Sequence, residues 1–171
     1  MQEKTAEALG ISPELVAVAS TGVIGELLPM DKIISGIEQL DKTTGSSTGF
    51  HEAILTTDIT MKDVVVSHEF QGKEVLVAGV SKGSGMIHPN MATMLGFITT
   101  DAKIASNTLQ KLLKEVIDVT FNQITVDGDT STNDMVLVLA NGQSESDEII
   151  EDSTEYQDFK EMLHLVCQTL A

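Results

Sequence analysis

The stretch Asp63-Val-Val-Val-Ser-His-Glu-Phe-Gln-Gly-Lys-Glu-Val-Leu-Val-Ala-Gly-Val80 contains two valine-rich runs on either side of a short polar segment. The runs are residues 64–70 and 74–80, and their composition is typical of β-strands. Gln71-Gly72-Lys73 between them has the length and the glycine of a hairpin connection. The stretch therefore predicts two antiparallel strands, around which the other expected elements are arranged.

Short apolar runs predict four further strands, at residues 15–19, 95–99, 124–126 and 135–140. The first is expected to be buried and to end at Ser20-Thr21-Gly22. Apolar residues at helical spacing predict four helices: 5–9 ended by Gly10, 30–40, 109–120 with Ser106 as N-cap, and 156–170. Residues 41–49 are expected to form a polar loop and the acidic residues 144–155 a solvated linker.

Hairpins mixed with helices indicate an α+β fold, a layered α/β arrangement. With 171 residues the chain is expected to be a single domain or the central portion of a larger one. Its net charge of −16 repels phosphate backbones and anionic lipids, so nucleic acid and membranes are not expected partners. Aromatic residues make up only 4% of the chain, which argues against base-stacking or sugar-stacking modules.

The apolar runs at 75–80 and 135–140 are far shorter than the roughly 20 residues of a membrane-spanning helix. The first seven residues lack the apolar core of a signal peptide, and the lone Cys167 has no partner for an internal disulfide. We therefore expect a cytoplasmic protein.

Three common functional motifs can be tested and rejected. In Lys82-Gly-Ser-Gly the lysine precedes the glycines, whereas in a phosphate-binding loop it follows them. Residues 127–134 resemble a calcium loop, but Thr132 replaces the required glycine and Val138 the required glutamate. The four histidines, at positions 51, 68, 88 and 164, lack the spacing of zinc ligands. No metal site is expected.

Hydroxyl chemistry remains, and it centres on Lys82-Gly-Ser-Gly-Met-Ile-His-Pro-Asn-Met-Ala-Thr-Met-Leu95. Here Thr93 follows the small residue Ala92 in a glycine-rich segment suited to tight turns. A threonine that becomes the first residue of a chain can use its own α-amine as the base. By composition alone, however, the segment is more typical of a plain small-residue loop between strands.

Four motifs carry a resemblance to a known family: residues 82–95, Ser20-Thr-Gly-Val-Ile-Gly-Glu-Leu-Leu-Pro-Met-Asp31, Thr56-Thr-Asp58 and Ile124-Thr-Val-Asp-Gly-Asp-Thr-Ser-Thr-Asn-Asp134. In this order and approximate spacing they resemble ornithine acetyltransferase, the bifunctional glutamate N-acetyltransferase family of arginine biosynthesis. The resemblance implies a self-processing fold of the N-terminal-threonine type, a sandwich of sheets flanked by helices. It also implies acetyl transfer from N-acetylornithine to glutamate, and in some members from acetyl-CoA, without a cofactor.

By this resemblance Thr93 is the nucleophile, and the Ala92–Thr93 bond is cut autocatalytically. Thr21 and Gly22 correspond to the family's oxyanion donors, while Thr56 and Lys82, together with Thr93, correspond to substrate-binding positions. The cut would leave residues 1–92 as the C-terminal part of an α chain and residues 93–171 as the N-terminal part of a β chain. The family resemblance implies a heterotetramer of two α and two β chains.

Three alternatives stay open. A related self-processing aminopeptidase would share the cleavage, but its nucleophile is typically serine. Complete family members are much longer, so the chain can also be an inactive fragment of the acetyltransferase. Residues 127–134 either cap backbone groups in a tight loop or act near the acetyl site.

Overall fold

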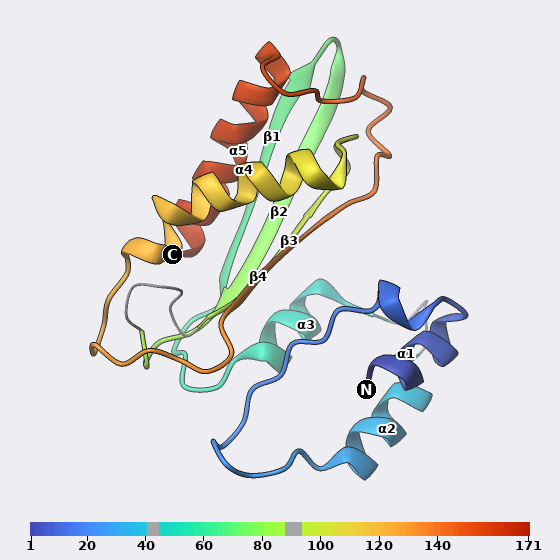
Figure 1. Cartoon of the computed structure of the whole chain (residues 1–171), viewed down its shortest axis with the longest axis vertical. Helices are drawn as coiled ribbons and strands as arrows, with labels where there is room; N and C mark the ends of the chain where they lie inside the picture. The colour runs from blue at the N-terminus through green and yellow to red at the C-terminus, as the bar shows by residue number, and fades with distance from the viewer. Residues whose placement is uncertain (41–44, 88–93) are drawn as a thin grey trace. The chain divides into compact units, whose positions relative to one another are not determined.

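A computed structural model describes residues 1–40, 45–87 and 94–171 of the chain (Figure 1). By their contacts the residues divide into two compact units, Met1–Phe50 and His51–Ala171. The α+β class expected from the sequence is confirmed, because helices and one four-stranded sheet make up the ordered elements of these residues.

The second unit is built on a sheet of four neighbouring strands in the order β1-β2-β3-β4. They are β1 (Lys62–Phe70), β2 (Lys73–Lys82), β3 (Leu95–Thr100) and β4 (Met135–Ala140). The β1–β2 and β2–β3 pairs are antiparallel and the β3–β4 pair is parallel. Four of the predicted strands, including the two of the hairpin, therefore exist, each within two residues of the expected bounds.

The hairpin turn explains why β1 and β2 pair in this register. Phe70 pairs with Lys73, so Gln71 and Gly72 alone form the turn. Their φ angles are 52° and 79°. Two-residue hairpins of type I′ require positive φ at both central positions, and glycine adopts it without steric cost.

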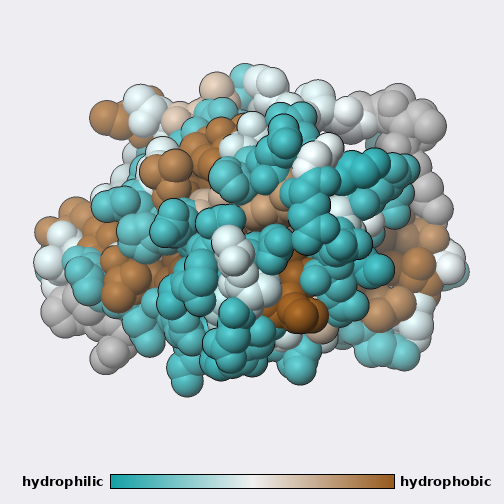
Figure 2. Space-filling view, turned by 90° about the horizontal axis from the view of Figure 1, so that it is seen from above, coloured by the Kyte–Doolittle hydropathy of each residue, from teal (hydrophilic) through white to brown (hydrophobic). Residues whose placement is uncertain are grey.

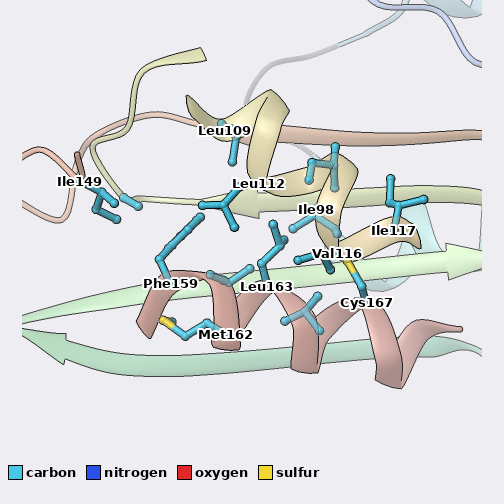
Figure 3. Close-up of a cluster of buried hydrophobic side chains, with 14 of the residues drawn as sticks. Ile98, Leu109, Leu112, Val116, Ile117, Ile149, Phe159, Met162, Leu163 and Cys167 are labelled. Atoms are coloured by element: carbon cyan, nitrogen blue, oxygen red, sulfur yellow. The ribbon is translucent and has the colours of Figure 1, made fainter. Parts of the chain in front are cut away.

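Two long helices, α4 (Ser106–Asp118) and α5 (Thr154–Leu170), pack with the sheet around one hydrophobic core (Figure 3). The helix face predicted near the C-terminus is confirmed, since all five of its residues are buried: Tyr156, Phe159, Leu163, Val166 and Leu170. The Ser153 side chain caps α5 by accepting a hydrogen bond from the Tyr156 N–H at 3.1 Å. In α4, Ser106 is the first helical residue and Ala105 is the N-cap, so the predicted N-cap is one residue off.

The first unit contains α1 (Gln2–Leu9), a 3-10 helix η1 (Pro13–Leu15) and α2 (Met30–Glu38). The helix α3 (Ser47–Ile54) contains the sequence boundary between the two units. The helices predicted at 5–9 and 30–40 are thus present. The loop predicted at 41–49 is wrong at its end, because residues 47–49 already belong to α3.

Two predicted strands are wrong. Residues 15–19 begin in η1 and continue as chain outside any strand, and Leu15 and Val18 are exposed. Residues 124–126 follow a second 3-10 helix, η2 (Phe121–Gln123), and form a loop. An apolar run becomes a strand only where a neighbouring strand bonds its backbone. In the described sheet, β1 to β4 pair only with one another, and neither run is among them.

The acidic linker at 144–155 is only partly solvated. Ile149 is buried and forms a parallel bridge with Ile104, and Ser146 is also buried.

On the face seen in Figure 2, hydrophilic residues cover much of the surface and hydrophobic residues lie in patches between them. Within the described parts of the chain, none of the helices has the length and apolar content needed to cross a membrane.

Replacement of Phe159 by alanine tests the importance of the core between α5 and the sheet. Phe159 is fully buried, so the cavity should lower the free energy of unfolding by about 3–5 kcal/mol. Leu165 lies on the same helix and is 49% exposed, and its replacement by alanine should change stability by no more than about 0.5 kcal/mol. Urea denaturation measures both, and equal effects would contradict the assignment of α5's buried face.

Candidate active site

The pairing of β2 with β3 brings the two ends of the glycine-rich segment together. Lys82 is the last residue of β2 and pairs with Leu95, the first residue of β3. The segment between them is therefore a loop that leaves and re-enters the same sheet at neighbouring positions. Ala92 and Thr93, the predicted cleavage site and nucleophile, lie on this loop but outside the described residues.

The loop leaves β2 through Gly83, which has a φ of 143°. Residues with a side chain rarely adopt this conformation, whereas glycine adopts it readily. Both backbone groups of Gly83 are bonded: its N–H donates to Asp58 Oδ1 at 2.6 Å, and its carbonyl accepts from Lys62 Nζ at 3.2 Å. The turn after the predicted substrate contact Lys82 is thus fixed by side chains from outside the loop.

The same carboxylate fixes the segment that carries Thr56. Asp58 Oδ2 accepts a hydrogen bond from the Thr56 N–H at 3.3 Å. The hydroxyls of Thr57 and Ser84 lie 2.7 Å apart and form a second connection. The structure therefore brings two of the predicted site residues, Thr56 and Lys82, to one place through Asp58, although Thr56 is exposed and Lys82 is only 4% exposed.

Asp127 binds the loop a few residues further on. Its Oδ2 accepts from the Met86 N–H at 2.5 Å and its Oδ1 from the Ile87 N–H at 2.9 Å. The Ile87 carbonyl in turn accepts from the Val126 N–H at 2.8 Å. The backbone N–H groups of Met86 and Ile87 lower the pKa of Asp127 below its ordinary value, because they stabilise the charged form.

Asp134 binds the loop where it returns to the sheet. Its Oδ1 accepts from the Met94 N–H at 3.0 Å, and the Met94 carbonyl accepts from the Met135 N–H at 3.0 Å. Burial raises the pKa of Asp134 above its ordinary value, against the smaller opposing effects of the bonds from Met94 and Ser131. Both ends of residues 88–93 are consequently held by carboxylates of one loop, residues 124–134.

Of the two roles left open for residues 127–134, backbone capping is confirmed for Asp127 and Asp134. Sequence analysis missed which backbone they cap and missed Asp58 altogether as a site residue. The available signal was the presence of aspartates within three of the four family-like motifs. Their partners are 25 to 41 residues away in sequence, so spacing alone does not reveal them.

Thr21 and Gly22, the predicted oxyanion donors, belong to the first unit and are exposed. They do not end a strand, so the structural setting predicted for them is wrong, while their role remains a prediction.

The single cysteine adds no reactive thiol to this site. Cys167 is fully buried in the core, and burial raises its pKa to about 12, which keeps the thiol protonated. No three or more His, Cys, Asp or Glu side chains among the described residues are grouped to hold a metal ion.

The fold and the site define an α+β protein whose glycine-rich loop between two paired strands is held by aspartates. A model of the ArgJ family matches residues 1–171, so the chain belongs to the ArgJ family. The chain is 58% identical over 171 residues to the "arginine biosynthesis bifunctional protein ArgJ" of Bacillus subtilis strain 168. It is 59% identical over 171 residues to the protein of that name from Streptococcus mutans.

These matches cover 100% of this chain but 42% and 43% of the two relatives, so the chain spans less than half their length. A crystal structure of ArgJ from Bacillus halodurans is 48% identical, with a TM-score of 0.45. That likeness covers 46% of this chain and 37% of the crystallised one.

The pKa of Asp127 predicts how pH affects the replacement of Asp127 by asparagine. Because the folded-state pKa is lowered, the ionised carboxylate stabilises the fold above the ordinary pKa of 3.8, and this contribution is lost as pH falls through the folded pKa. Wild type should therefore be more stable than D127N at pH 7, with a smaller difference at pH 3. Urea denaturation at the two pH values measures this.

Asp129→Asn is the matched control, because it removes the same charge from the same loop and leaves the Asp127 carboxylate in place. Its effect on stability should be smaller at pH 7. A stability difference for D127N that does not change between pH 7 and pH 3 would contradict the charge-dependent bonding of Met86 and Ile87.

Proposed function

We propose that the chain carries the nucleophile of an acetyltransferase of arginine biosynthesis. The enzyme would move an acetyl group from N-acetylornithine to glutamate, with acetyl-CoA as a further donor in some family members. The main support is the match of all 171 residues to the ArgJ family, whose curated relatives are named as bifunctional proteins of arginine biosynthesis. No cofactor is required by this proposal.

Self-cleavage comes first. The Thr93 hydroxyl attacks the Ala92 carbonyl carbon, the acyl group moves from nitrogen to oxygen, and the Thr93 nitrogen leaves as an amine. Water then hydrolyses the ester, which releases the Ala92 carboxylate and restores the hydroxyl. The new α-amine has an unperturbed pKa near 8, so at neutral pH a fraction is neutral and can act as a base.

Acetyl transfer follows in two half-reactions. The Thr93 hydroxyl attacks the acetyl carbonyl of N-acetylornithine, the amide bond breaks, and ornithine leaves with a proton on its amine. The amine of glutamate then attacks the acetyl ester and regenerates the hydroxyl, which gives ping-pong kinetics. Negative charge on the acetyl oxygen needs aimed donors, and the proposal assigns this role to Thr21 and Gly22.

The burial of Lys82 supports a role in binding a substrate carboxylate. Its side chain is almost completely buried, and among the described residues its ammonium makes no hydrogen bond or ion pair. An ammonium removed from water is costly unless an anion accompanies it. The α-carboxylate of an amino-acid substrate would supply that anion, beside Thr56 on the neighbouring segment.

The pairing of β2 with β3 supports a stable complex of the two cleavage products. A cut at Ala92–Thr93 leaves β2 in residues 1–92 and β3 in residues 93–171, but six residue pairs still join the strands, from Val77–Thr100 to Lys82–Leu95. We propose that the two products remain one subunit pair and that two such pairs form the heterotetramer.

Thr93→Ala tests both reactions. The purified chain should separate into two fragments that break at Ala92–Thr93, and the fragment beginning at Thr93 should gain one acetyl group on incubation with N-acetylornithine. T93A should do neither, because the attacking oxygen is gone. Intact mass spectrometry before and after incubation measures both events.

Thr99→Ala is the control for T93A, since Thr99 is an exposed residue of β3, and it should behave as wild type. Cleavage or acetylation in T93A would remove Thr93 from its role. An uncut wild-type chain would indicate the inactive fragment, and cleavage with hydrolysis of amino-terminal peptides but no acetylation would indicate the aminopeptidase.

Lys82→Met tests the proposed carboxylate contact. A hydrogen bond to a charged group contributes about 1.5–3 kcal/mol, so the KM for N-acetylornithine should rise about tenfold to a hundredfold. The control is Lys73→Met at the other, exposed end of β2, where the lysine pairs with Glu145. Steady-state kinetics with N-acetylornithine and glutamate measure KM, and an unchanged KM in K82M would contradict the contact.

A further inference from the structure

We propose that Asp127 and Asp134 are positioning residues for self-cleavage, which hold the two ends of residues 88–93 and so align the Thr93 hydroxyl with the Ala92 carbonyl. The inference rests on the proposed cut at Ala92–Thr93. Neither aspartate touches the reacting atoms in this proposal; both act through the backbone of Met86, Ile87 and Met94.

The end next to the nucleophile is held at three points. Met94 nitrogen is bonded directly to the carbonyl carbon of Thr93, and its N–H donates to Asp134 Oδ1 at 3.0 Å. The Met94 carbonyl accepts from Met135, the first residue of β4. The Met94 side chain is 5% exposed and belongs to the hydrophobic core. The residue after Thr93 therefore has its donor, its acceptor and its side chain all fixed.

The other end needs its carboxylate for a different reason. Met86 has a φ of 59°, a left-handed conformation that is unfavourable for a residue with a side chain. The N–H groups of Met86 and Ile87 both point at the Asp127 carboxylate, which stabilises this conformation. The Ile87 side chain is also buried, at 4% exposure.

Fixing both ends matters because the acyl shift depends on geometry. The hydroxyl oxygen has to lie about 3–3.5 Å from the carbonyl carbon, and a misplacement of about 1 Å can slow such a reaction on the order of a hundredfold. One loop, residues 124–134, carries both carboxylates. It therefore sets the separation of the two ends of residues 88–93.

The two aspartates differ in whether an asparagine in their place can keep the same hydrogen bonds. Asp127 uses both oxygens as acceptors, and the amide of asparagine offers only one acceptor, so D127N must lose a bond. Asp134 accepts from the Met94 N–H at Oδ1 and also from the Ser131 hydroxyl. Asparagine keeps an acceptor for Met94, and its NH2 group can donate to the serine hydroxyl instead. A positioning role thus predicts that asparagine restores function at position 134 but not at position 127.

The test compares the first-order rate of self-cleavage in wild type, D134A, D134N and D127N, followed by intact mass of the 171-residue chain. The control is D101A. Asp101 Oδ1 accepts from the Leu76 N–H at 2.8 Å, which is the same kind of bond near the opposite end of β2. Urea denaturation of each variant separates a loss of stability from a loss of positioning, and hydrogen exchange at the Met94 amide reports directly on the Asp134 bond.

We expect D134A to cleave at least about tenfold more slowly than D101A, with faster exchange at Met94, and D134N to recover about tenfold over D134A. D127N should be slowed more than D134N. If D134A does not fold, D134E replaces it, because it keeps the charge but moves the carboxylate by one methylene. It should show the same slow cleavage.

Cleavage of D134A, or of D134E in its place, at the rate of D101A would overturn the positioning role while leaving the proposed function intact. A D134N as slow as D134A, with its Met94 amide still protected, would also overturn it. An uncut wild-type chain would overturn the proposed self-cleavage and this inference together, and the wild-type sample distinguishes that result from the others.

Discussion

The antiparallel pairing of β2 with β3 is the constraint on which the rest of the site depends. Because Lys82 is paired with Leu95, the chain that leaves the sheet after Lys82 must return to it on the adjacent strand, directly opposite the point where it left. Among the described residues of this loop, the N–H groups of Gly83, Met86, Ile87 and Met94 are bonded by side chains from other segments. The side chains that supply the missing partners are therefore the ones that define the geometry of the loop.

Those side chains are aspartates, in a chain whose net charge is −16. Asp58, Asp127 and Asp134 each accept backbone N–H groups of the loop, so three of the acidic groups cap its backbone, Asp127 from an exposed position and the other two from partly buried ones. A charged acceptor forms stronger hydrogen bonds than a neutral one. The cost is visible at Asp134, where burial opposes ionisation, and the bond to Met94 offsets part of it.

The sequence predicts best where one local pattern determines the structure. The hairpin follows from two valine-rich runs and a glycine turn, and α5 follows from apolar residues at helical spacing. Residues 15–19 and 124–126 have the composition of strands but lack a pairing partner among the described strands, and composition does not reveal partners. The site shows the same limit: Thr56 and Lys82 were found by motif, whereas the caps from Asp58, Asp127 and Asp134 depend on contacts between distant segments.

After a cut within this loop, the two products have to stay together for the fold to persist. The hydrophobic core can hold them together, because its residues come from both sides of the proposed cleavage site. Phe70, Val75 and Val77 precede the site, while the buried faces of α4 and α5 follow it. Ser81, also before the site, donates its hydroxyl to the Leu170 carbonyl at the end of α5. Cleavage would thus remove one covalent link while the strand pairs, the core and the bonds from Met86 and Ile87 to Asp127 still join the two products. The new N-terminus at Thr93 would begin next to the residue that Asp134 holds.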